Sequence, residues 1–269
     1  MPVRLERPAE HPHVALVTID RPEKANSLNL SMLRELAGAW REIAADDGVR
    51  CAIVTGGGGR VFCSGMDMRS TIPVSQRFAR GEKVDDDDFE GLRSVATALL
   101  AGFDLRTPLV CAINGHARAG GFDMMLASEI RYAVPEATFA LEEVALGFYP
   151  TGNSTVLLPQ QIGWVHAHEI MLTARPFSAE RAVDIGVVNR VVESTDLLAT
   201  AFETADAIAG NAPLAVRETR RGVREIVGMS LEDGYSRQEA IGRELRKTDD
   251  AREGQRAFVE KRRPEWQGR

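Results

Sequence analysis

Two acidic residues, Asp123 and Glu143, accompany two short loops that are rich in small residues, at positions 63–67 and 119–121. Each loop follows an apolar run typical of a buried strand. One backbone N–H group from each loop, aimed at the same oxygen atom, would form an oxyanion hole. The second loop also begins a predicted helix, whose dipole favours negative charge. Paired carboxylates beside such a hole are what general acid–base catalysis requires, so the stretch 114–155 predicts a reaction at a carbonyl group.

Taken singly, these features have plainer interpretations. Glycines after strands are typical of tight turns, and an acid on a helix is usually solvated. The catalytic interpretation depends on their combination in one stretch of sequence.

The composition limits the partners of this site. The chain has 269 residues, of which 44% are hydrophobic, and its net charge is −6 at pH 7. This length supports one large core, and an acidic chain without a basic stripe is not expected to bind nucleic acid. No run approaches the roughly 18 apolar residues of a membrane span, so we expect no membrane partner. The amino end lacks an apolar signal core and the three cysteines form no paired framework, which favours a cytoplasmic protein.

Strand and helix signals alternate up to about residue 195. Continuous apolar runs at 14–19, 51–55 and 109–113 predict strands that are covered on both faces. Asn29 predicts the cap of a helix whose apolar residues keep helical spacing as far as Ala44. Shorter signals predict strands at 130–134, 139–141 and 187–192, and helices at 92–100, 121–128, 166–172 and 178–185. This alternation is typical of an α/β core.

Beyond residue 195 only helices are predicted, at 197–209, 214–227, 231–245 and 250–261. Asp250 and Glu253 have the spacing of a capping box at the start of the last helix. We therefore divide the chain into a core at 1–195 and a carboxyl-terminal helical region at 196–269.

Two groups of possible metal ligands do not form a metal site in this interpretation. Four consecutive aspartates, at 85–88, lack the alternating spacing and the glycine of a calcium loop, so we expect a solvated, mobile loop. His166 and His168 are two residues apart, which places them on different faces of a helix. We expect no metal.

Five motifs in this order resemble the enoyl-CoA hydratase/isomerase (crotonase) family. They are DRPEKANSL at 20–28, FCSGMD at 62–67, NGHA at 114–117 with two glycines at 120–121, LTARPFSA at 172–179, and a tail with DAREG at 250–254 and KRRP at 261–264. The resemblance covers nearly the whole chain. It implies a crotonase-like spiral of ββα units with a helical trimerisation region, assembled as a homotrimer or a dimer of trimers. It also implies an acyl-CoA substrate, with no separate cofactor because the CoA thioester itself reacts.

The resemblance assigns roles residue by residue. It implies that the oxyanion hole is formed by the N–H groups of Met66 and Gly120, which would stabilise a thioester enolate, and that Asp123 and Glu143 are the catalytic acids. It implies CoA contacts at Lys24, Ala25, Ser27, Leu28, Ser64, Asp67 and Met68, and, from the tail of a neighbouring subunit, at Phe258 and Lys261. We expect residues 70–90 to form much of the acyl pocket, and His116 and Arg118 to make loop or subunit contacts.

The reaction stays open at this point. Hydratases of the family resemble this chain at Glu143 but have a glutamate at the position of Asp123, where the side chain here is shorter by roughly 1.5 Å. Dienoyl isomerases have an aspartate there, yet they use another aspartate where this chain has Thr151, and monoenoyl isomerases need only one base. We rank hydration of a trans-2-enoyl-CoA to a 3-hydroxyacyl-CoA first and isomerisation of an enoyl-CoA or dienoyl-CoA second. An acyl-CoA-binding protein with weak or no catalysis is the non-enzymatic alternative.

Overall fold

Two sheets form the centre of the protein in the computed structural model, which describes residues 2–269. The larger sheet has six strands in the order β1-β2-β3-β5-β7-β10, and the smaller has four in the order β4-β6-β8-β9. All neighbouring strands run parallel except β1 with β2 and β9 with β8. The strands are β1 Val3–Glu6, β2 Val14–Ile19, β3 Cys51–Gly56, β4 Val61–Cys63, β5 Leu109–Ile113, β6 His116–Arg118, β7 Ile130–Ala133, β8 Thr138–Ala140, β9 Phe177–Ser178 and β10 Arg190–Val191.

From β3 to β8, consecutive strands alternate between the two sheets. The pairs β3–β4, β5–β6 and β7–β8 each give their first strand to the larger sheet and their second to the smaller one, and helices follow each pair. The repeated unit is therefore ββα, and its repetition builds the predicted spiral. The expectation of an α/β fold with a helical carboxyl-terminal region is confirmed.

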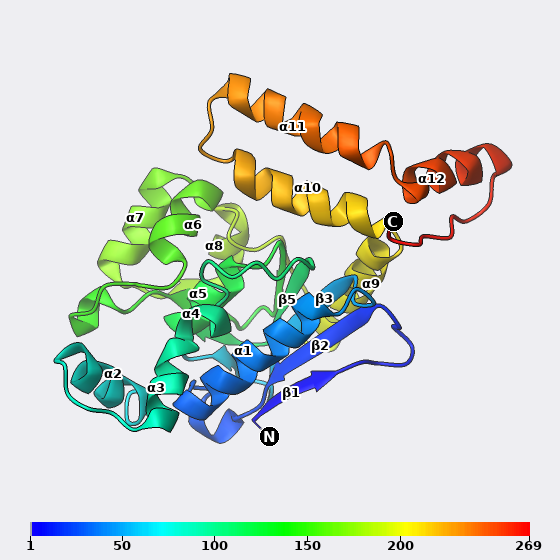
Figure 1. Ribbon diagram of the computed structural model, residues 1–269. Helices are drawn as coiled ribbons and strands as arrows, with labels where there is room; N and C mark the ends of the chain where they lie inside the picture. Colours follow the sequence, from blue (N-terminus) through cyan, green and yellow to red (C-terminus); the bar gives the residue numbers. More distant parts are fainter. Residues whose placement is uncertain (1) are drawn as a thin grey trace.

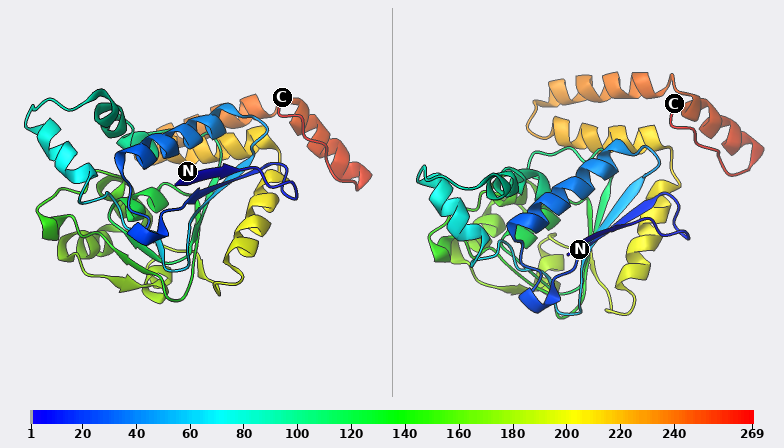
Figure 2. Two further views of the ribbon diagram at one scale, coloured as in Figure 1. Left: turned by 90° about the horizontal axis from the view of Figure 1, so that it is seen from below. Right: turned by 60° about the horizontal axis from the view of Figure 1, so that its bottom comes forward.

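The larger sheet lies between helices α1 and α9, as the two views of Figure 2 show. α1 begins where predicted, because the side chain of Asn29 accepts the N–H of Met32, and its buried face includes Leu36 and Trp40. Between β4 and β8 the chain forms short helices: α2 Thr71–Ala79, α3 Asp86–Arg93, α4 Val95–Ala98 and α5 Gly120–Leu126. The remaining helices are α1 Leu30–Ala45, α6 Ser154–Ile162, α7 Trp164–Thr173, α8 Ala179–Asp184 and α9 Leu197–Ala209, with 3-10 turns at Pro22–Lys24 and Val144–Leu146.

Three helices extend away from the sheets at the carboxyl end: α10 Pro213–Ile226, α11 Leu231–Leu245 and α12 Asp249–Glu260. In Figure 1, α10 and α11 form a hairpin along one side of the molecule and α12 lies beyond it. The predicted boundary between residues 195 and 196 stands just before α9. That helix still packs on the larger sheet through buried residues such as Leu197 and Ala201. The projecting arm is therefore formed by α10 to α12.

Three local predictions are wrong. The aspartates at 85–88 do not form a loop: Asp85 caps α3 by accepting the N–H of Asp88, and the others fill the first turn, where negative charge favours a helix. The helix predicted at 92–100 is divided at Ser94, whose hydroxyl donates to the carbonyl of Glu90.

The capping box is also absent from α12, because the helix begins one residue earlier than predicted. Thr248 is its cap and accepts the N–H of Ala251. Asp250 and Glu253 instead hold the tail, by accepting backbone N–H groups of Gln267 and Glu265.

No helix within residues 2–269 is both long and apolar enough to cross a membrane. The same residues contain no cluster of three or more histidine, cysteine or acidic side chains placed to hold a metal ion.

An ion-pair cluster attaches α10 to the core. Arg220 donates from Nε to Glu129 (2.9 Å) and from Nη1 to Asp104 (2.8 Å), and its side chain is only 6% exposed. Arg224 reaches the same Glu129 oxygen at 2.9 Å.

We therefore expect Arg220→Ala to lower the free energy of unfolding by about 2 kcal/mol, because it leaves two carboxylates without their shared buried partner. Arg252→Ala removes an exposed arginine of α12 and should change it by less than about 1 kcal/mol. Urea denaturation measures both values, and equal effects of the two substitutions would contradict this account.

Candidate active site

Two backbone turns, one containing Gly65 and Met66 and the other Ala119 and Gly120, lie against each other. A Cβ atom on Gly65 would lie 3.1 Å from the nitrogen of Gly120, so the turns are in direct contact. Leu28 pairs with one edge of the first turn, donating to Gly65 O and accepting from Asp67 N, which leaves the N–H of Met66 directed away from Leu28. Within residues 2–269 neither Met66 nor Gly120 has a hydrogen-bond acceptor for its N–H. Both donors are therefore available to a ligand.

Strain and close packing fix the second turn. Ala119 has φ +43° and ψ −121°, a conformation that is unfavourable for a residue with a side chain, and its N–H donates to Ala140 O at 3.0 Å. A Cβ atom on Gly121 would lie only 2.3 Å from the carbonyl oxygen of Cys63, so that position requires glycine. The turn thus has one geometry, and this geometry sets the direction of the Gly120 N–H.

Glu143 carries a carboxylate oxygen with no partner. It immediately precedes the turn Val144–Leu146 and accepts the N–H of Phe148 on its backbone carbonyl. Its Oε2 atom is buried and makes no hydrogen bond among the described residues. Burial raises the pKa of Glu143 to about 7, and the negative charges of Asp123 and Glu142 add to the rise. A carboxyl group that titrates near neutral pH is suited both to accept and to donate a proton.

Asp123 is near Glu143 but is bound differently. Its Oδ1 atom accepts the backbone N–H groups of Asn153 and Ser154, each at 2.7 Å, and the hydroxyl of Ser154. The side chain is almost completely buried, and burial raises the pKa of Asp123. The two acids that the sequence paired are thus close in space. Asp123 binds the start of α6 through Oδ1, and its Oδ2 atom makes no hydrogen bond among the described residues.

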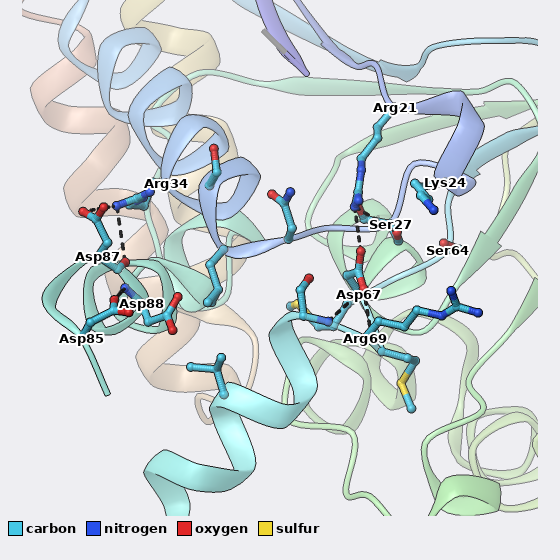
Figure 3. A pocket seen from close by; sticks show the side chains of 17 residues that line it. Arg21, Lys24, Ser27, Arg34, Ser64, Asp67, Arg69, Asp85, Asp87 and Asp88 are labelled. Atoms are coloured by element: carbon cyan, nitrogen blue, oxygen red, sulfur yellow. Dashed lines mark hydrogen bonds and ion pairs between the residues drawn. The ribbon is translucent and has the colours of Figure 1, made fainter. Parts of the chain in front are cut away.

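A cleft of about 1190 Å³ opens beside the Met66 turn. Figure 3 shows its walls, which come from the segment after β2, from α1, and from the start of α2 and α3. Most of the CoA contacts predicted within one subunit line it: Lys24, Ser27, Ser64, Asp67 and Met68. Ala25 and Leu28 support the cleft from behind, since Ala25 O accepts the N–H of Ser64 and Leu28 is fully buried against Met66.

Some charged side chains of this cleft form ion pairs with each other, and Asp67 is one of them. Asp67 is bound by Arg21 at 2.8 Å, and Figure 3 shows this pair in the cleft wall. Burial opposes the ionisation of Asp67, but the hydrogen bond from Arg21 and the N–H groups of Arg69 and Ser70 outweigh it and hold the pKa of Asp67 at about 2. Asp67 thus fixes the loop and is not free to contact a ligand through its carboxylate.

Three cationic residues of the cleft, Arg21, Arg34 and Arg69, were not predicted as site residues from the sequence. Arg34 pairs with Asp87 at 2.9 Å on the far wall, whereas Arg69 is exposed and, like Lys24, takes part in no ion pair within residues 2–269. The sequence offered one signal for Arg69, its place two residues after Asp67 on the same loop.

Two other groups of residues lie outside the cleft. Phe258 and Lys261, at the end of α12, do not line the cleft, and Phe258 is 86% exposed. Arg118 donates to Thr138, which also binds His116, and its second nitrogen lies 3.6 Å from Glu142. His116 and Arg118, which lie in β6, therefore contact Thr138 of the neighbouring strand β8, and Arg118 also lies near Glu142 beside the Glu143 segment.

Comparisons with known proteins identify the class to which this fold and site belong. Residues 9–269 match the family model described as enoyl-CoA hydratase/isomerase. The chain belongs to this family and is an enzyme of it.

The most similar relatives carry hydratase or dehydratase names. Enoyl-CoA hydratase EchA19 of Mycobacterium tuberculosis is 37% identical over 257 residues, covering 96% of this chain and 94% of the relative. Carnitinyl-CoA dehydratase of Proteus mirabilis is 37% identical over 258 residues, covering 94% of each. The crystal structure of an enoyl-CoA hydratase from Bacillus anthracis superposes with a TM-score of 0.89 at 31% identity and full coverage of both chains.

We expect Gly121→Ala to reduce turnover of an enoyl-CoA by about a hundredfold, because the added Cβ must displace the Cys63 loop and with it the two N–H groups. Gly59→Ala is the matched control, since a Cβ there meets no atom within 4 Å. Loss of the absorbance of the conjugated thioester measures both rates. Wild-type turnover in a folded Gly121→Ala variant would contradict the assigned role of this contact.

Proposed function

We propose that this enzyme adds water reversibly to the double bond of a trans-2-enoyl-CoA and forms a 3-hydroxyacyl-CoA. The observation that carries the proposal is the buried, unpartnered Oε2 atom of Glu143, with a pKa near 7, in a site that also has two free N–H groups. The hydratase and dehydratase names of the relatives support the same chemistry.

The proposed oxyanion hole explains why the substrate is a thioester. The N–H groups of Met66 and Gly120 donate to the thioester oxygen, which gains negative charge when a water oxygen bonds to C3. Each well-placed donor of this kind contributes about 2.7–4 kcal/mol to the stability of the transition state. Glu143 takes the proton that this water loses. The resulting carboxylic acid returns a proton to C2, so the enolate collapses to the product and Glu143 is ionised again.

Unpaired cations at the cleft suit the phosphates of CoA. The net charge of −6 provides no general attraction for an anion, so the phosphates must be met locally. Arg21 is occupied by Asp67 and Arg34 by Asp87, which leaves Lys24 and Arg69 as the cleft cations free of ion pairs among residues 2–269. We assign the phosphates to these two side chains.

Lys24→Met and Arg69→Met should therefore each raise the KM for an enoyl-CoA about tenfold at low salt and leave kcat within about twofold, because the cations bind a part of the substrate that does not react. With the matching enoyl-pantetheine, which lacks the nucleotide, both variants should behave like the wild type. An equal effect on the two substrates would contradict the phosphate assignment.

Glu143→Gln should reduce kcat/KM by about 10²–10⁴ while CoA binding is kept, because the amide cannot accept the proton of water. For the wild type, kcat/KM for hydration should rise with pH up to about 7, since the base must be ionised and burial raises its pKa to about that value. Glu142→Gln is the control with a neighbouring acid. Turnover that survives in Glu143→Gln would remove Glu143 as the principal base.

Double-bond isomerisation is the second candidate, and one observation favours it. Glu143 has a buried, unpartnered carboxylate oxygen, whereas the carboxylate of Asp123 is bound through Oδ1 to the start of α6, and position 151 is a threonine. A single base is sufficient to move a proton between two carbons. Incubation of 2- and 3-enoyl-CoAs of several chain lengths in D₂O separates the candidates: water addition changes the mass by one molecule of water, whereas isomerisation incorporates deuterium alone.

The oligomeric state of the protein is also part of the proposal. Exposed Phe258 and Val259 at the end of α12 are suited to contact with another copy of the chain. We propose that α12 reaches the cleft of a neighbouring subunit in a trimer or a dimer of trimers, with Lys261 near the nucleotide.

A further inference from the structure

The segment that carries Glu143 is fastened at both ends to one turn of α5. Residues 141–153 leave β8 at Ala140, whose carbonyl accepts the N–H of Ala119 at 3.0 Å. They enter α6 at Asn153 and Ser154, whose N–H groups both donate to Asp123 at 2.7 Å. Ala119 and Asp123 are themselves joined, because the N–H of Asp123 donates to Ala119 O at 2.9 Å. The same turn of α5 presents the N–H of Gly120.

Asp123 takes the place of an N-cap for α6. Asn153 precedes that helix, but its side chain makes no capping bond and donates instead to Leu99 O (2.8 Å) and Asp123 O (2.9 Å). The free N–H groups at the start of a helix are best satisfied by an oxygen acceptor, and the helix dipole favours a negative one. Ser154 is fully buried, so water does not substitute for this acceptor.

The second oxygen of Asp123, Oδ2, makes no hydrogen bond among the described residues and lies close to the backbone of Gly152. A Cβ atom on Gly152 would lie 2.3 Å from Oδ2, so the chain passes directly over the carboxylate. A glutamate at this position would extend roughly 1.5 Å further and would push into the turn 152–154. Aspartate therefore fits this arrangement better than the longer acid.

We propose that Asp123 is a positioning residue, which sets the place of Glu143 relative to the Gly120 N–H, and that Glu143 alone exchanges protons with the substrate. The inference rests on the proposed function and replaces the catalytic role that the sequence suggested for Asp123. The hydrogen bonds that Asp123 accepts from Asn153 and Ser154, called the anchor below, form without substrate. Their contribution to stability is therefore measurable separately from catalysis.

Asp123→Asn tests the two roles directly. Asparagine keeps the size and an acceptor oxygen and caps helices about as well as aspartate, but it exchanges no proton in the working pH range. We expect this variant to keep kcat/KM within tenfold of the wild type, whereas Asp123→Ala should lose more than tenfold and melt at a lower temperature. A loss above tenfold in Asp123→Asn at an unchanged melting temperature overturns the proposal.

The pH profile gives a signature that a structural role alone does not produce. The charged groups around Glu143 are Asp123 from α5, Glu142 from its own segment, and Arg118 from β6, which lies beside Glu142. Asp123→Asn removes one negative charge and should lower the pKa of Glu143, so the rise of kcat/KM should move to lower pH. A rise that stays at its wild-type pH contradicts the proposal.

Ser154→Ala provides a second variant, in which the carboxylate is kept and one of its donors is removed. A weaker anchor should reduce kcat/KM threefold or more, and a change below twofold overturns the positioning role. Melting temperatures test the anchor without substrate: an Asp123→Ala protein as stable as the wild type overturns it. A wild-type enzyme that converts no enoyl-CoA overturns the proposed function instead, so the two failures are distinguishable.

Discussion

The close contact between two backbone turns is the constraint on which the rest of the site depends. Residues 65–66 follow β4 and residues 119–121 follow its neighbour β6, and the parallel pairing of β4 with β6 brings the two segments together. Only glycine fits at position 121, because Cys63 O occupies the space of a side chain. Two N–H groups thus remain without acceptors in a region where nearly every buried donor is paired. The spiral of ββα units is the means by which distant segments are brought to this contact.

Acidic residues that look alike in the sequence have different partners and different burial in the structure. Asp67 is ionised and tied to Arg21, and it stabilises the first turn. Asp123 accepts hydrogen bonds at the start of α6, and Glu143 keeps one oxygen buried and unpartnered. Environment rather than residue type therefore sets the contacts of each carboxylate and the direction in which its pKa moves.

The sequence predicted the parts of the fold that follow from strong local patterns. It predicted the buried strands that begin at positions 14, 51 and 109, and it predicted the Asn29 cap, because apolar runs and capping residues act locally. The prediction of a loop at 85–88 was wrong, because four aspartates suit the first turn of a helix as well as a solvated loop. At the site, the residue pattern pointed to the two loops and to Asp123 and Glu143, and family resemblance assigned the donors to Met66 and Gly120. The hydrogen bonds of Asp123 were not predictable, because their partners lie about thirty residues away in the chain.

The two-ended attachment of the Glu143 segment has a consequence for divergence. Its anchors involve the backbone of Ala119 and Ala140 at one end and the N–H groups of Asn153 and Ser154 at the other, so they do not depend on the side chains of residues 142–152. Val144, Leu146 and Tyr149 are all exposed. Substitutions in this segment can therefore accumulate without moving its ends.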